Sequence, residues 1–116
     1  MIETHASVNL SALTALKSVL GEDFPELIHD FNIHSSDCLI KMEHAIAHDD
    51  RATIKQLAHS LKGAALSMHA KALSDCCAEL ESSATFVDKP QLREMIQRVH
   101  DEVKEVITVI EEWLGR

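Results

Sequence analysis

The chain has 116 residues, 46% of them hydrophobic, with three glycines, two prolines, three Phe and one Trp, and its formal net charge is −8. The apolar content excludes a disordered chain, the scarcity of glycine and proline argues against an all-β fold, and the length allows a single domain, residues 1–116. An acidic surface repels phosphate backbones and anionic membranes, so neither nucleic acid nor a membrane is expected as a partner.

Hydrophobic periodicity predicts a short helix and then a long one in the first half of the chain. Residues 1–8 are expected to be a loose lead-in. Asn9 or Ser11 can cap a short helix that ends at Gly21. Pro25 then fits the first turn of a long helix, in which apolar side chains hold one face for about six turns.

The second half of the chain predicts three more helices. The third is expected over about 51–68, after a capping aspartate at 49–50, and the fourth over about 70–84. An aspartate cap and a first-turn proline within 88–90 begin a fifth, whose apolar stripe over 92–114 recurs at alternating steps of four and three. Four long amphipathic helices with short loops predict an all-α, antiparallel, up-and-down four-helix bundle, with the short first helix as a lid.

The cysteines and the hydropathy pattern favour a reducing compartment. Cys38, Cys76 and Cys77 make an odd count with an adjacent pair, which suits buried thiols better than a disulfide. No apolar stretch approaches the roughly 18 residues of a membrane span, and the start of the chain lacks the layout of a signal peptide. A cytoplasmic location is therefore expected.

His59 stands on the wrong side of the third predicted helix for a core residue. With Leu61 at the centre of the buried stripe, 100° per residue places His59 about 160° away, opposite the core. Between residues 51 and 74 the chain carries four basic side chains and no Asp or Glu. The neighbours of the histidine by helical spacing are Ala52, Lys55, Lys62, Gly63 and Leu66.

These neighbours suit a histidine that carries a phosphoryl group. The ammonium groups of Lys55 and Lys62 disfavour the imidazolium, keep the ring nucleophilic, and neutralise a phosphate once it arrives. Gly63 costs a helix up to about 1 kcal/mol relative to Ala, but it leaves room for another molecule. Ala52 and Leu66 form an apolar rim on which a partner can dock. An exposed histidine between lysines is also common on solvated surfaces, so these residues alone leave both interpretations open.

Residues 57–65, LAHSLKGAA, closely resemble the signature A-H-x-L-K-G-[SA] of histidine-containing phosphotransfer (HPt) domains. Residues of the second and fourth helices are similar to the family as well, so the resemblance covers most of the chain. It implies a free-standing HPt protein with His59 as the phosphoacceptor. Lys62 is then its electrostatic neighbour, and Gly63 is the position of close approach.

Two further positions are compared with the family pattern. Glu81 stands where the family often has Gln or Glu near the active histidine, although a carboxylate there could equally face solvent. His69 is a departure, because the turn after the third helix usually carries a glycine at this position. A non-glycine residue with positive φ carries a steric cost, which leaves the conformation of that turn open.

The resemblance implies a phosphorelay intermediate rather than an independent enzyme. The receiver domain of a hybrid sensor kinase would present an aspartyl phosphate, and His59 would attack the phosphorus in line through Nε2. The phosphoryl group would then pass to the receiver domain of a response regulator. No carboxylate cluster flanks His59 and the three glycines are too scattered to bind ATP, so this chain is expected to hold no metal or cofactor. Mg²⁺ and an acidic pocket are expected from the receiver domain.

Ile33 and Ile40 are candidate docking residues on the second helix. Both fall about 160–180° from Phe31, outside the main apolar stripe. An antiparallel third helix would place Ile40 near the level of His59. The alternative is that the short first helix covers one or both of them.

Two other functions stay open at this point. His44 and His48 stand at i, i+4 with Asp49 next, so a metal-binding bundle is one of them, although a metal site needs three or four ligands. The other is a non-phosphorylated helical adaptor or coiled-coil dimer that uses the stripe over 92–114. A monomer is expected if the bundle itself buries that stripe.

Overall fold

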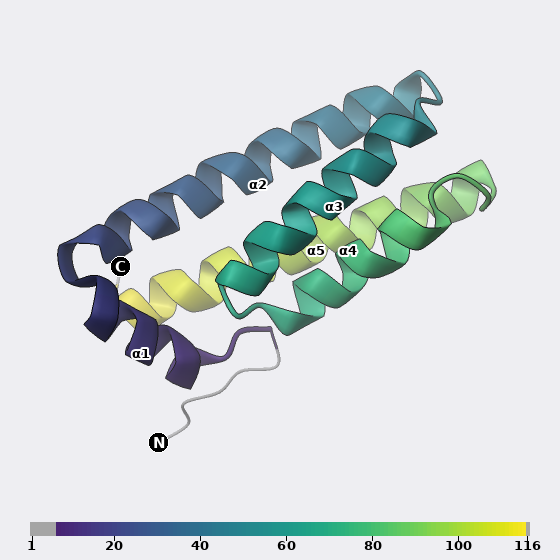
Figure 1. Ribbon diagram of the computed structural model, residues 1–116. Coiled ribbons are helices and arrows are strands. Elements are labelled where there is room, and N and C mark those ends of the chain that lie inside the picture. The colour runs from purple at the N-terminus through teal and green to yellow at the C-terminus, as the bar shows by residue number, and fades with distance from the viewer. Residues whose placement is uncertain (1–6, 116) are drawn as a thin grey trace.

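Five α-helices and one 3₁₀ turn make up residues 7–115, the part of the chain that the computed structural model describes. In chain order they are α1 (Leu10–Leu20), η1 (Gly21–Asp23), α2 (Phe24–Ala47), α3 (Arg51–Ser67), α4 (Lys71–Ser83) and α5 (Lys89–Leu114). The pairs α2–α3, α3–α4 and α4–α5 pack together, and α5 closes the ring against α2, with successive helices antiparallel (Figure 1). This arrangement confirms the predicted four-helix bundle.

Three helices begin at the polar residues that the sequence marks as caps. Asn9, Asp50 and Asp88 each accept a hydrogen bond from the backbone N–H three residues on, at 3.0, 3.2 and 2.9 Å. These bonds satisfy donors that have no partner inside the helix. Asp49 does not cap; its φ of 53° instead reverses the chain between α2 and α3. The remaining boundaries differ from the predicted ones by one or two residues, as fraying ends do.

The core lies between the four long helices and is almost wholly aliphatic. The stripe of α5 is buried inside this chain, including Val99 and Val106, both with no exposed surface. Because the bundle uses this stripe, the adaptor or coiled-coil alternative loses the surface on which it depended. Leu39, Met95 and Val109 are also buried, outside the predicted stripes. No helix in the described residues is both long enough and apolar enough to cross a membrane.

The short helix α1 lies across one end of the bundle, as a lid (Figure 1). Its Leu13 is fully buried. At the same end the rings of Phe24 and Trp113 meet edge to face with centroids 5.9 Å apart, and Lys17 Nζ lies 5.7 Å from the Trp113 ring centroid. These contacts join α1, α2 and α5.

The lid does not reach the outer face of α2. Ile33 is 55% exposed and Ile40 is 60% exposed. The alternative in which α1 covers one or both of them is therefore wrong. Two isoleucines seven residues apart remain in solvent on one side of that helix.

The expected loose lead-in is wrong for the two of its residues that the structure describes. Ser7 and Val8 are only 5% and 1% exposed, and the next residue, Asn9, donates its backbone N–H to the carbonyl of His69 at 2.9 Å. This hydrogen bond and the apolar contact of Val8 fix the chain against the α3–α4 turn. Residues 1–6 of that expectation lie outside the described residues.

The cysteines are free, as predicted. Cys38 and Cys77 are buried, whereas Cys76, which was expected to point inward, is only partly buried. Desolvation by burial raises the pKa of the Cys77 thiol to about 12. Such a thiol stays protonated at neutral pH and packs as a small apolar group.

The α3–α4 turn passes through His69, whose φ is 54°. An L-residue in this conformation brings its Cβ close to the backbone, at a cost of about 1–2 kcal/mol that glycine avoids. We expect His69→Gly to raise the free energy of unfolding by up to about 1 kcal/mol in urea denaturation. The control is His69→Ala, which removes the ring but keeps the positive φ. An equal gain in both variants would show that the ring, not the backbone, is the source of strain.

Candidate functional site

His59 lies near the middle of α3 with 69% of its side chain exposed. The buried positions Ala58, Leu61 and Ala65 fix this orientation, since they have no exposed surface and hold the opposite side of the helix in the core. The geometry is the one that helical periodicity predicts: a histidine held in solvent by a rigid, packed helix.

A carboxylate from the neighbouring helix contacts the ring of His59. Glu81 of α4 places Oε2 at 2.9 Å from His59 Nδ1 and Oε1 at 2.8 Å from Lys62 Nζ. The sequence left open whether this carboxylate faces solvent. The structure places it between the other two side chains, and only 23% of it is exposed.

Charge determines how these hydrogen bonds are oriented. The hydrogen bond from Lys62 is the main cause that lowers the pKa of the Glu81 carboxyl below its ordinary value. Desolvation acts against it, and the hydrogen bond from His59 acts with it. The carboxylate is therefore ionised at neutral pH and can only accept. His59 Nδ1 must then be the donor, which in the neutral ring leaves the lone pair on Nε2.

Lys62 differs in one respect from its sequence-based interpretation. It was expected to be a bare ammonium beside the histidine, but it is 30% exposed and bound to Glu81. The pair is close to neutral as a unit, so the ring meets a compensated charge rather than an isolated cation. Lys55 fits the expectation better, because it is exposed and makes no ion pair among residues 7–115.

A shallow groove between α3 and α4 contains His59. Its lining comes from both helices and from the residues just after α4, namely Ala52, Lys55, Gln56, His59, Glu81 and Thr85. Gln56 and Thr85 carried no signal in the sequence, because a polar residue on an outward helical face or after a helix is ordinary surface.

The remaining predicted neighbours extend the same face of α3. Gly63 is exposed, and a Cβ added there would meet no atom within 4 Å, so no packing inside this chain requires a glycine. Leu66 is 60% exposed one turn further along. The helix thus presents His59 with an open backbone position on one side and an apolar side chain beyond it.

A polar contact that the sequence does not reveal joins α2 to α3 beside the histidine. Ser60 Oγ lies 3.0 Å from His34 Nε2, and Cys38 Sγ lies 3.7 Å from the same nitrogen. Nothing in the spacing of these residues marks the contact, since it depends on the register of two helices. It holds α2 and α3 together at the level of His59.

His44, near the end of α2, and His48, just after it, show no metal-binding arrangement. His48 Nδ1 lies 2.8 Å from the carbonyl oxygen of His44, so this ring nitrogen donates to the helix itself. Within residues 7–115 no three His, Cys, Asp or Glu side chains come together as potential metal ligands. The described part of the chain therefore holds no set of ligands for the metal-binding function.

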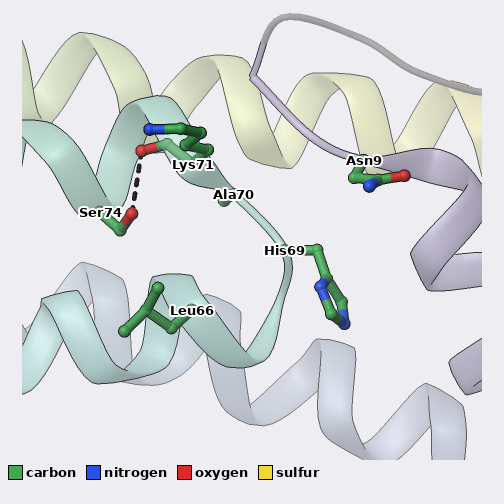
Figure 2. A pocket seen from close by; sticks show the side chains of 6 residues that line it. All are labelled: Asn9, Leu66, His69, Ala70, Lys71 and Ser74. Carbon is green, nitrogen blue, oxygen red and sulfur yellow. Dashed lines mark hydrogen bonds between the residues drawn. The ribbon is translucent and has the colours of Figure 1, made fainter.

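A second pocket lies at the α3–α4 turn (Figure 2). Its residues come from the end of α3, the turn, the start of α4 and the residue before α1, namely Asn9, Leu66, His69, Ala70, Lys71 and Ser74. Ser74 Oγ donates to the carbonyl of Lys71 at 2.9 Å, and Lys71 Nζ pairs with Asp75 at the same distance. The residues that line this pocket include no carboxylate beside the ring of His69, whereas Glu81 contacts the ring of His59.

Comparisons with known proteins agree with this geometry. Residues 26–113 match the family described as Hpt domain. The fold is similar to the crystal structure of histidine-containing phosphotransfer protein B (HptB) from Pseudomonas aeruginosa PAO1, with a TM-score of 0.84 and 25% sequence identity over 91% of this chain and 92% of that one. No curated protein sequence matches the chain. The family match spans most of the chain, which therefore belongs to the histidine-containing phosphotransfer domains, the phosphocarriers of phosphorelay signalling.

Proposed function

We propose that His59 is the phosphoacceptor of this chain. It takes a phosphoryl group from the aspartyl phosphate of one receiver domain and passes it to the aspartate of another. The observation that carries the proposal is the 2.9 Å contact between His59 Nδ1 and the ionised Glu81, on a ring that is 69% exposed. This contact leaves Nε2 as the nucleophilic nitrogen, on the accessible surface.

The transfer is a displacement at phosphorus. The Nε2 lone pair forms the new N–P bond while the bond between phosphorus and the aspartyl oxygen breaks, and the aspartate leaves as a carboxylate. The imidazole ring then carries a positive charge, which Glu81 stabilises through Nδ1–H. Lys55, unpaired within residues 7–115, faces the phosphoryl oxygens with positive charge, and Lys62 adds a positive charge that Glu81 partly balances. Attack on phospho-His59 by the second receiver's carboxylate is the same step in reverse.

The receiver domain supplies what this chain lacks for catalysis. We infer that Mg²⁺ and the acidic pocket around the reacting aspartate come from the receiver, and that the chain works as a monomeric phosphocarrier without an ATP site. Its own contribution is to position the ring and to balance charge, which is much of the catalysis in phosphoryl transfer.

Receiver docking would use the apolar positions around the histidine. Ala52 and Leu66 lie seven residues before and after His59, so helical spacing places them on its face, about 10 Å away along α3. Ile33 and Ile40 would extend the contact over α2, and both are exposed. Burial of these side chains would supply the apolar part of the binding energy.

A transfer assay tests the proposed function. The full chain is mixed with a panel of receiver domains of hybrid sensor kinases and response regulators, each carrying a labelled aspartyl phosphate. The expected result is label on this chain that is lost in acid and retained in base, as for a phosphohistidine. No label from any receiver, with helicity intact, would refute the proposal and leave His59 as ordinary surface.

Gly63 offers a test in which stability and transfer change in opposite directions. We expect Gly63→Ala to raise the free energy of unfolding by about 0.5–1 kcal/mol, because alanine favours the helix and its Cβ has open space. Transfer should slow several-fold if the receiver backbone approaches at this position. Urea denaturation and transfer rates measure the two effects. An unchanged rate in the stabilised variant would remove Gly63 from the docking surface.

A further inference from the structure

Arg51 fixes the loop between α4 and α5 against the start of α3. Its Nη1 donates to the carbonyl of Ala84 at 3.1 Å and also to the carbonyl of Val87. Its Nε is 3.2 Å from Asp49 Oδ1, so the guanidinium itself is held in place. The two residues between those carbonyls therefore keep a defined position next to the first turn of α3.

One of these two residues is an exposed phenylalanine. Phe86 is 75% exposed, although its backbone N–H donates to Ser83 O at 3.1 Å in an ordered turn. The residue before it, Thr85, lines the groove that contains His59. Phe86 is thus the next residue in the chain after one that lines the groove. The start of α3, where Ala52 lies, is the end of the groove nearest to it.

The size of a receiver interface brings this loop within reach. A stable interface covers about 800 Å² on each partner, which is a disc of roughly 16 Å radius. Centred on His59, such a disc extends beyond Ala52, which is two helical turns or about 10 Å away. A partner that presents its aspartate to His59 and lies along the groove therefore extends past Ala52 toward the loop that carries Phe86.

Charge indicates which partner lies there. The segment from residue 51 to 74 carries four basic residues and no acidic one. Three of them are paired with carboxylates of neighbouring segments, namely Arg51 with Asp49, Lys62 with Glu81 and Lys71 with Asp75. Lys55 lines the groove and has no ion pair among the described residues. A partner with carboxylates beside an apolar contact complements this combination, and a second copy of this acidic chain does so less well.

We propose that Phe86 is an anchor for the receiver domain. Its ring inserts into an apolar contact at the edge of the receiver's acidic face, while the groove of α3 and α4 aligns the reacting aspartate with His59. This inference rests on the proposed function. Phe86 touches no reacting atom, so it acts on affinity and not on the chemical step.

Binding and transfer measurements on Phe86→Ser test the proposal. The probe is the receiver domain that labels the wild type fastest, with beryllofluoride and Mg²⁺ as a stable mimic of its phosphorylated state. We expect Kd to rise at least about tenfold, as for an aromatic anchor. The rate of transfer at saturating receiver should stay within twofold. Val19→Ser is the matched control, because Val19 is 82% exposed on α1, at the other end of the bundle (Figure 1).

Each result decides for or against the anchor. A tenfold loss of affinity in Phe86→Ser alone, with unchanged thermal unfolding, supports it. The proposal is overturned if the affinity of Phe86→Ser stays within twofold of wild type, or if Val19→Ser loses as much affinity. It is also overturned if the wild-type chain self-associates and Phe86→Ser does not. If the wild type takes label normally and Phe86→Ser binds normally, only this inference fails. If no receiver labels the wild type, the proposed function fails and the anchor with it.

Discussion

Replacement of His59 by glutamine is expected to reduce phosphoryl labelling of the chain below detection. Glutamine has no lone pair that can take a phosphoryl group, yet its amide nitrogen can donate to Glu81 as His59 Nδ1 does. Because 69% of the histidine side chain is exposed, the free energy of unfolding should change by less than about 0.5 kcal/mol. Labelling and urea denaturation of the same preparation separate loss of the acceptor from loss of the fold.

His34→Gln is the matched control for this experiment. His34 is also partly exposed and contacts Ser60, the residue next to His59 in the sequence. The control should keep its label. If His59→Gln retains label, or if His34→Gln loses it with the fold intact, another side chain is the acceptor.

The second large effect is expected at Glu81. Removal of its carboxylate in Glu81→Ala frees His59 Nδ1 and Lys62 Nζ, so the ring is neither oriented nor fixed in one tautomer. Carboxylates that orient metal-binding histidines contribute about 10–100-fold in activity, and we expect a loss of similar size in the transfer rate here. Glu81→Gln keeps an oxygen that can accept from Nδ1–H, so its loss should be smaller, about tenfold.

The dependence on pH gives an independent check on Glu81. Because hydrogen bonds from Lys62 and His59 lower its pKa, the carboxylate stays ionised above the ordinary value of 4.5, and its contribution is lost only as the pH falls through the lowered pKa. The wild type should therefore transfer faster than Glu81→Gln at every pH from 6 to 8, where the Glu81 carboxylate is ionised throughout. Equal rates in Glu81→Gln and wild type over this range, or equal rates in Glu81→Ala and wild type, would show that the carboxylate does not orient the ring.

Most of the bundle could be predicted from periodicity, because each helix buries its own apolar stripe and that stripe can be recognised in the sequence of the helix alone. The stripes on α3 and α5 and the caps at Asp50 and Asp88 depend on residues at most a few turns apart. The exposure of His59 follows in the same way, since its angle from Leu61 is fixed by helical geometry. All of these features are confirmed in the structure.

The features that could not be predicted depend on contacts between helices. The position of Glu81 depends on the register of α4 against α3, and the contact between His34 and Ser60 depends on that of α2 against α3. The periodicity of a single helix carries no information on how it is positioned along its neighbour. The burial of Val8 likewise accompanies a long-range contact, because the backbone N–H of the next residue, Asn9, donates to the carbonyl of His69 in the distant α3–α4 turn.

The hydrogen bond between His59 and Glu81 joins residues 22 positions apart, on two different helices. A peptide copied from residues 57–65, or the same nine residues transplanted onto an unrelated helix, would carry the histidine and the lysine but not the group that holds the ring. Anyone who builds an artificial phosphocarrier from this signature must also graft an acidic residue onto the adjacent helix, in matching register. Partial unfolding that detaches α4 would equally release the ring of His59 while leaving the helix that bears it intact.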